Sequence, residues 1–91
     1  MATLICLHYF VSGKVQGVWF RASAKEQADL LGITGWVRNL PDNRVEVLAC
    51  GDKEKLAILQ KWLHVGPKLA HIVHLAIEEL PYKEYRGFEV L

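Results

Sequence analysis

The amino-acid sequence predicts an α+β fold with the element order β-α-β-β-α-β and a short final strand. Three observations support this: apolar, β-rich runs, two segments whose apolar residues recur at helical spacing, and turn residues at the junctions. Crossovers between strands are right-handed, and a split β-α-β arrangement places the third strand between the first two. We therefore expect an antiparallel sheet with both helices on one face and a short terminal edge strand.

Residues 4–11 (Leu-Ile-Cys-Leu-His-Tyr-Phe-Val) form a β-rich run that Ser12-Gly13 ends, and they are predicted to be the first strand. The run is apolar at both odd and even positions, which is typical of a central strand. Side chains alternate between the two faces of a strand. The odd-numbered residues would share one face and the even-numbered ones the other: Ile5, Leu7, Tyr9 and Val11 against Cys6, His8 and Phe10.

Two segments are predicted to be helices. Residues 21–31 contain good helix formers without Pro or Gly, and Gly32 follows as a stop signal. The second helix begins after Asp52, which is expected to cap it, and ends before Val65-Gly66-Pro67. The buried stripes would comprise Ala24, Ala28 and Leu31 in the first helix, and Leu56, Leu59 and Leu63 with Trp62 beside them in the second.

The second and third strands are predicted to form a hairpin. They cover residues 34–39 and 44–50, and the turn between them reads Leu40-Pro41-Asp42-Asn43. Pro pre-sets one backbone dihedral of such a turn, while Asp and Asn tolerate tight conformations.

The last part of the chain is expected to add two strands. Residues 70–77 are predicted to be the fourth strand, 78–86 a polar loop, and 87–91 a short final strand. No internal boundary, repeat or low-complexity segment interrupts the sequence. Residues 1–91 are therefore expected to form a single domain.

Composition narrows the class of protein. The chain has 91 residues, 52% of them hydrophobic, and a net charge of +1 from 11 basic and 10 acidic side chains. This near balance argues against duplex nucleic acid or an anionic membrane as a partner. No run approaches the roughly 20 apolar residues of a membrane-spanning helix, and the N-terminal run lacks the flanks of a secretion signal. We expect a cytoplasmic monomer.

The stretch from Val11 to Arg21 (Val-Ser-Gly-Lys-Val-Gln-Gly-Val-Trp-Phe-Arg) connects the first strand to the first helix. Gly13 and Gly17 let the backbone bend tightly, so that successive N–H groups can point at one anion. The helix adds the positive end of its dipole, and Arg21 adds a planar fork of donors. The stretch therefore predicts a small phosphate-binding cradle.

Each of these residues also has a plain structural interpretation. The loop could be only a turn between strand and helix, Arg21 an exposed residue at a helix start, and Asn39 a turn residue before Leu40-Pro41. A P-loop is disfavoured, because Lys14 directly follows the first glycine and no Gly-Lys-Ser/Thr ends the run. Nucleotide binding is therefore not expected.

Two motifs together resemble a known family. Gly13-Lys14-Val15-Gln16-Gly17-Val18-Trp19-Phe20-Arg21 is similar to the first signature of the acylphosphatases. Gly35-Trp36-Val37-Arg38-Asn39, followed by Val45 and Gly51, resembles the second. The resemblance covers essentially the whole chain. It implies a ferredoxin-like α/β sandwich that hydrolyses the carboxyl-phosphate bond of acyl phosphates without a metal or other cofactor.

The resemblance also implies roles for individual residues. Arg21 takes the place of the phosphate-binding arginine, and Asn39 that of the asparagine that orients the attacking water. The partners would be a small acyl phosphate and inorganic phosphate. One position departs from the family pattern: Asn43 stands where the family usually has Gly, at a turn position expected to need a positive φ. The loop of phosphate-binding backbone donors falls on Gln16, Gly17, Val18, Trp19, Phe20 and Arg21.

The chemistry of the residues agrees with these roles. An acyl phosphate is already activated, so an enzyme has to hold the phosphoryl group, stabilise its developing charge and place a water in line. Arg21 and the loop N–H groups would do the first two, and the Asn39 carbonyl oxygen would accept a hydrogen bond from the water. A neutral amide takes up no proton at neutral pH. Neither motif contains His, Asp or Glu, so no general base is expected.

Aromatic and histidine side chains outside this scheme are expected to be structural. Phe20, Trp36 and Tyr9 are assigned to the core, and Trp19 to the mouth of the site. The pair His71 and His74 could suggest a metal site, but a spacing of three on a strand places the two on opposite faces.

Cys6 and Cys50 are too few and too far apart for a zinc site or a disulfide-built scaffold. Cys6 lies early in the first strand and Cys50 late in the third. In an antiparallel pair these positions come to the same end of the sheet, on the face away from the helices. A cross-strand disulfide is therefore allowed, and two free thiols in a reducing cytosol are the alternative.

A non-catalytic ferredoxin-like binding or accessory module is the competing function. RNA-recognition domains share the strand order but need exposed aromatics on the third strand, which here reads Arg-Val-Glu-Val-Leu-Ala-Cys. Domains related to acylphosphatases also occur fused within a carbamoyl-transferring maturation protein. This chain shows no zinc-motif extension after Leu91, so a free-standing enzyme is expected.

Overall fold

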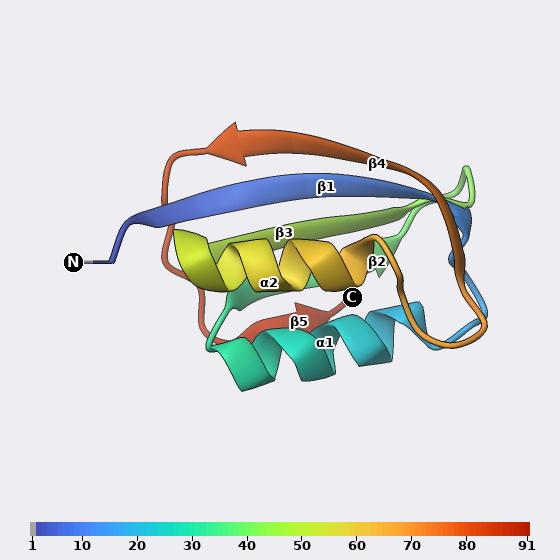
Figure 1. Ribbon diagram of the computed structural model, residues 1–91, viewed down its shortest axis with the longest axis horizontal. Helices are drawn as coiled ribbons and strands as arrows, with labels where there is room; N and C mark the ends of the chain where they lie inside the picture. Colours follow the sequence, from blue (N-terminus) through green and yellow to red (C-terminus); the bar gives the residue numbers. More distant parts are fainter. Residues whose placement is uncertain (1) are drawn as a thin grey trace.

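The computed structural model describes residues 2–91. The chain forms a five-stranded sheet, and two helices cover one of its faces (Figure 1). This is the two-layer α+β arrangement predicted from the sequence. The elements in chain order are β1 (Leu4–Lys14), α1 (Phe20–Leu31), β2 (Thr34–Asn39), β3 (Val45–Asp52), α2 (Lys53–Leu63), β4 (His71–Leu80) and β5 (Phe88–Val90).

The strand order is β4-β1-β3-β2-β5, with β3 between β1 and β2 as predicted. The first four strands pair antiparallel, but β5 pairs parallel to β2, so the sheet is mixed. The expectation of a wholly antiparallel sheet is therefore corrected at its last strand. The physical reason is that β2 and β4 run in opposite directions. After β4 the chain crosses one end of the sheet and turns back, so β5 has to run opposite to β4 and parallel to β2 (Figure 1).

Three strands are longer than predicted, and β3 continues past Cys50 to Asp52. β1 continues through Ser12-Gly13 to Lys14, and the register with β4 shifts between Ser12 and Gly13. A Cβ at Gly13, whose φ is 126°, would collide with the main-chain oxygen of His71. The glycine therefore lets β1 stay paired with β4 up to the loop instead of ending the strand. β4 extends to Leu80 because Glu78 and Leu80 keep their pairing with β1, on His8 and Cys6.

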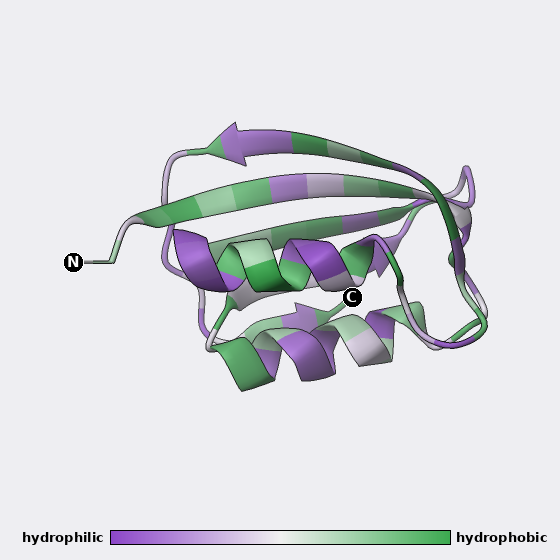
Figure 2. Ribbon diagram, in the orientation of Figure 1, coloured by the Kyte–Doolittle hydropathy of each residue, from purple (hydrophilic) through white to green (hydrophobic). Residues whose placement is uncertain are grey.

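The main core lies between the sheet and the helices. Both helices alternate between polar and apolar segments along their length (Figure 2). Gly32 ends α1 with a φ of 67°, as its sequence position predicts, and the Asp52 carboxylate caps α2 by accepting from the Glu54 N–H over 3.0 Å. The helices bury Phe20, Ala24, Ala28, Leu56, Leu59 and Leu63 against Tyr9, Val11, Val37, Val45 and Val47.

A smaller apolar cluster lies on the opposite face of the sheet. Cys6 and Cys50 are directly paired in the β1–β3 register, their Cα atoms are 4.0 Å apart, and their sulfur atoms form a disulfide. Leu48 is buried beside them. Trp36, expected in the core, packs half-buried against this cluster. Its even position on β2 directs it away from the helices, which explains the difference.

Glu46 is a buried carboxylate on the same face, with 6% of its surface exposed. The His8 ring nitrogen lies 2.7 Å from one carboxylate oxygen, and the Arg38 Nε donates to the other. Burial raises the pKa of Glu46, but the hydrogen bonds from Arg38 and His8 outweigh it and hold the pKa below its usual value. This network was not predicted, because its three members are distant in the sequence.

Candidate active site

A pocket of about 360 Å³ opens where the loop between β1 and α1 meets the end of β2. It brings together the two residues predicted to carry the chemistry, Arg21 and Asn39. Both motifs contribute to its lining although they are far apart in the sequence. The lining residues are Val15, Gly17, Trp19, Phe20, Arg21, Ala22, Asn39 and Val90.

The loop bends at two positions with left-handed backbone. Gly17 has a φ of 72°, and Trp19, the N-cap residue of α1, has a φ of 65°. A Cβ built on Gly17 would meet no atom within 4 Å, so open space adjoins this part of the loop. Such bends turn successive main-chain N–H groups toward one side, which is the geometry of an anion-binding nest.

The start of α1 adds unpaired donors to this nest. Its first main-chain hydrogen bond runs from the Ser23 N–H to the Trp19 carbonyl oxygen over 3.0 Å. The N–H groups of Phe20, Arg21 and Ala22 therefore have no partner within the helix. Trp19 supplies no side-chain cap, and no acidic residue lies in the first turn. The positive end of the helix dipole is thus uncompensated by the chain, and it points where an anion would bind.

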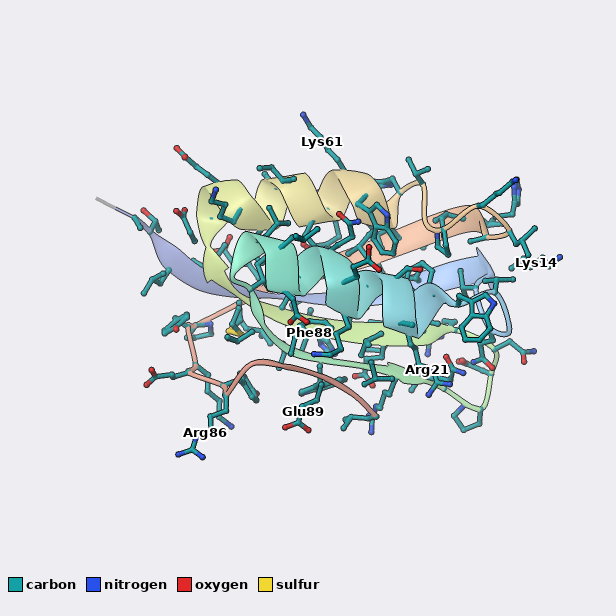
Figure 3. All side chains as sticks on the ribbon, turned by 90° about the horizontal axis from the view of Figure 1, so that it is seen from below. Lys14, Arg21, Lys61, Arg86, Phe88 and Glu89 are labelled. Carbon is teal, nitrogen blue, oxygen red and sulfur yellow. A yellow bond between two sulfur atoms is a disulfide. The ribbon has the colours of Figure 1, made fainter. Side chains whose placement is uncertain are left out.

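Arg21 is anchored on one side and leaves donors for the pocket on the other. Its Nη1 donates to the main-chain oxygen of Leu91 over 2.8 Å, and the Leu91 N–H donates in turn to the Val37 oxygen over 2.9 Å. A guanidinium has five N–H donors, so this bond orients the group and leaves the others free for a ligand. In Figure 3, Arg21 lies toward the same end of the molecule as Lys14, while Lys61 points away from the sheet.

Asn39, the last residue of β2, carries a buried carbonyl oxygen without a partner. Among the side chains of residues 2–91, its Oδ1 is the only buried nitrogen or oxygen that has no hydrogen bond. A buried acceptor left in this state costs about 1–3 kcal/mol. A water molecule that donated to Oδ1 would remove this cost, so the geometry suits the predicted water-orienting role.

Gln16 has a role that the sequence did not indicate. Its side-chain Nε2 donates to the Leu40 oxygen over 2.8 Å and to the Arg44 oxygen over 2.9 Å. The Leu40 N–H also donates to the Arg44 oxygen, and this main-chain hydrogen bond closes the β2–β3 turn. Gln16 therefore binds the turn at the two residues that close it. The side chain joins the loop between β1 and α1 to the hairpin that carries Asn39, and it does not line the pocket.

The other predicted loop residues divide between pocket and core. Gly17, Trp19 and Phe20 line the pocket, whereas Val18 is buried in the main core. Phe20 is also almost fully buried, as predicted, and Trp19 is 78% exposed at the rim. Asn43 has a φ of 75°, which confirms that this turn position needs a positive φ.

Within residues 2–91, no three His, Cys, Asp or Glu side chains gather closely enough to hold a metal ion. In the same part of the chain, no helix has the length and apolar character needed to cross a membrane.

The fold and the pocket define a ferredoxin-like α+β domain with a pocket beside the loop between its first strand and first helix. A family model described as Acylphosphatase matches residues 7–90. An acylphosphatase of Legionella pneumophila (strain Paris) is 50% identical over 91 residues, which is 100% of both chains. The chain therefore belongs to the acylphosphatase family, whose members are hydrolases that act on acyl phosphates.

Solved structures agree with this assignment. The structure of an acylphosphatase from Coxiella burnetii superposes with a TM-score of 0.93 at 43% identity, covering 97% of this chain and 93% of that one. The crystal structure of acylphosphatase from Bacillus subtilis gives a TM-score of 0.92 at 30% identity, covering 98% and 99%. The mixed five-stranded sheet with two helices is thus the architecture of the family.

Proposed function

We propose that this protein hydrolyses the carboxyl-phosphate bond of small acyl phosphates, with Arg21 holding the phosphoryl group and Asn39 orienting the attacking water. One observation carries the proposal: an anchored guanidinium, an uncapped helix start and an unpartnered buried amide oxygen adjoin the same pocket. The first two features favour an anion, and the third favours a water beside it.

Phosphate binding is assigned to the loop and to Arg21. Main-chain N–H groups from Gln16 to Arg21 would surround the phosphoryl oxygens, and the free side of the guanidinium would pair with one or two of them. The Leu91 contact orients the Arg21 guanidinium, and α1 holds the N–H groups of its first turn, so these donors would need little rearrangement when the substrate binds. Fixed donors stabilise the charge that develops on the oxygens without reorganisation during the reaction.

Asn39 acts on the water and takes up no proton. Its Oδ1 would accept a hydrogen bond and so direct a lone pair of the water at phosphorus, in line with the carboxylate leaving group. A new P–O bond forms to the water as the P–O bond to the carboxylate breaks, so the carboxylate leaves with the bonding electron pair. Both water protons go with the phosphate product, which releases any excess proton to solvent. Orientation and electrostatic stabilisation are therefore enough, and the positive charge comes from Arg21 and the start of α1.

The oligomeric state, the location in the cell, the need for a cofactor and the binding partners belong to the same proposal. We propose that the chain works as a single-domain monomer in the cytoplasm, needs no cofactor, and binds acyl phosphate and inorganic phosphate rather than nucleic acid. The net charge of +1 disfavours a nucleic-acid backbone as partner. Sedimentation would test the monomer, and thiol-blocking lysis would show whether the Cys6–Cys50 pair is oxidised in the cell.

The direct test is hydrolysis of benzoyl phosphate by the purified protein with EDTA present. We expect turnover, loss of turnover with a folded Arg21→Gln variant, and a lower kcat with near-unchanged inhibition by inorganic phosphate for Asn39→Ala. Near-normal hydrolysis by either variant would refute the role of that residue. Phosphate binding by the unchanged protein without any hydrolysis would instead support the alternative, a non-catalytic accessory module. In H₂¹⁸O, label in phosphate rather than in benzoate would place the attack at phosphorus.

A further inference from the structure

Trp19 lies at the rim of the pocket with most of its side chain in solvent. It is 78% exposed, the most exposed of the large apolar side chains in residues 2–91. The residues on either side of it, Val18 and Phe20, are buried in the core. Large aromatic side chains gain their stabilisation by burial, so packing does not explain this position of Trp19.

The backbone at Trp19 is also unfavourable for a residue with a side chain. Its φ of 65° lies in the left-handed region, which costs a residue with a Cβ roughly 1–2 kcal/mol. Trp19 is the N-cap residue of α1, yet it makes no side-chain capping bond. Neither packing nor capping offsets the strain within the chain. Local strain of this kind is common where a residue is held for a ligand.

The in-line geometry of the reaction places the acyl group near this residue. The attacking water and the leaving group lie on opposite sides of phosphorus. Asn39, whose Oδ1 is buried, marks the water side at the floor of the pocket. The carboxylate therefore has to leave toward the open mouth, where the exposed lining residues other than Gly17 are Trp19, Ala22 and Val90. These three side chains are apolar and carry no charge.

On this basis we propose that Trp19 forms the acyl subsite and that the enzyme prefers flat, apolar acyl groups, aryl groups above all, to the smallest ones. The inference depends on the proposed function, because it assumes that Arg21 and Asn39 hold the phosphoryl end. An aryl ring can stack on or meet the edge of the indole, and such aromatic pairs add to the gain from burial. A methyl group reaches too little of the indole to gain the same contact.

The test compares benzoyl phosphate with acetyl phosphate for three proteins: the unchanged chain, Trp19→Ala and Trp19→Phe. We expect Trp19→Ala to lower kcat/KM for benzoyl phosphate about ten-fold and for acetyl phosphate less than about two-fold, the size expected for one aromatic contact. Trp19→Phe should keep most of the preference. Inhibition by inorganic phosphate should change far less than kcat/KM for benzoyl phosphate, since the proposed loop contacts to phosphate use main-chain N–H groups.

Leu30→Ala is the matched control, because Leu30 is 76% exposed on α1 and does not line the pocket. It should alter neither substrate. Equal losses on the two substrates with Trp19→Ala, or no loss on either, would overturn the acyl subsite. Calorimetric binding of benzoylphosphonate and acetylphosphonate, which are not hydrolysed, decides the question separately from turnover. If the unchanged protein hydrolysed neither phosphate, the proposed function would fail. The phosphonate pair would still show whether Trp19 selects the aryl ligand.

Discussion

The side-chain amide of Gln16 donates to the main-chain oxygen of Leu40 over 2.8 Å, and Leu40 directly follows Asn39 in the chain. The same amide donates to Arg44 across the turn. One side chain therefore connects the loop that would bind phosphate to the strand end that would orient the water. In the proposed mechanism the distance between these two parts sets the alignment of attack, so we expect Gln16 to be a positioning residue.

Replacing Gln16 with Ala should lower kcat by roughly ten-fold, the effect of a small misplacement of the water relative to phosphorus. Phosphate inhibition should change much less, since the loop N–H groups and Arg21 remain. The informative measurement is a double-mutant cycle with Asn39→Ala. If Gln16 acts through the position of Asn39, its replacement should have little further effect on kcat once Asn39 is gone.

Gln16→Glu is the matched variant for this cycle, because it keeps the shape but turns a carboxylate oxygen toward two carbonyl oxygens. It should reduce kcat more than Gln16→Ala does. Fully additive losses in the cycle would contradict the positioning role and leave Gln16 as a purely structural contact.

Gly17→Ala should weaken phosphate binding, whereas Gly32→Ala should leave phosphate binding unchanged. The two glycines have similar φ values, 72° and 67°, and a Cβ at either one meets no atom within 4 Å. The backbone cost, about 1 kcal/mol, should therefore be similar in both variants. Only the methyl group at Gly17 adjoins the pocket. Unfolding by urea and inhibition by phosphate would separate the two effects, and equal inhibition in both variants would argue against the cradle.

Glu46→Gln should lower the free energy of unfolding at neutral pH, and the difference from the unchanged protein should disappear in acid. The folded-state pKa of Glu46 lies below its usual value, so its ionised form stabilises the fold above about pH 4.3, the ordinary pKa of Glu. That contribution is lost as the pH falls through the lowered pKa. The expected loss at pH 7 is about 1–3 kcal/mol.

Urea unfolding of both proteins from pH 7 to pH 3 measures this difference, and it should shrink steadily toward acid. His8 and Arg38 face Glu46, and Glu78 on β4 is the register partner of His8. Glu78→Gln is therefore the control, and because Glu78 is exposed it should change stability little at any pH. A pH-independent effect of Glu46→Gln would show that the carboxylate is not ionised as inferred.

Asn43→Ala should lower stability while Asn43→Gly should not. Asn43 has a φ of 75°, and its N–H donates to the Leu40 oxygen over 3.2 Å within the turn. Ala adopts this backbone at a cost of about 1 kcal/mol more than Gly, and Asn tolerates it better than Ala. Thermal midpoints should therefore rank Gly at or above Asn, with Ala lowest. An Ala variant as stable as the unchanged protein would contradict this reason for the residue.

Removing the disulfide should lower stability without lowering turnover at 25 °C. The bond joins Cys6 and Cys50 across 44 positions of sequence, a loop for which about 2–4 kcal/mol is expected. Both residues lie at the end of the sheet away from the pocket, on the side where Cys6 pairs with Leu80. Urea unfolding of the Cys6→Ser, Cys50→Ser double variant measures the loss. Two titratable thiols in the unreduced, denatured protein would instead mean that the bond is not formed.

The order of elements was predictable because it depends on local properties of the chain. The β-rich apolar run at residues 4–11 and the helical spacing along 21–31 identify a strand and a helix without any distant contact. Gly32, Asp52 and Asn43 act through their own dihedrals or caps, and each has the predicted conformation. The proposed site could be named from the sequence because the two motifs resemble those of a known family, while their approach in space could not.

The sequence alone was therefore enough for the set of strands and helices, for the position of their ends to within a few residues, and for the candidate site residues of the proposal. Only the tertiary structure decided that β5 runs parallel to β2, that Gln16 joins the loop to the hairpin, and that Leu91 anchors Arg21. Local preferences act over a few residues. The hydrogen bonds from Gln16 to Leu40 and from Arg21 to Leu91 instead join groups that are 24 and 70 positions apart in the sequence. Such partners meet only when burial of the core brings the whole sheet together.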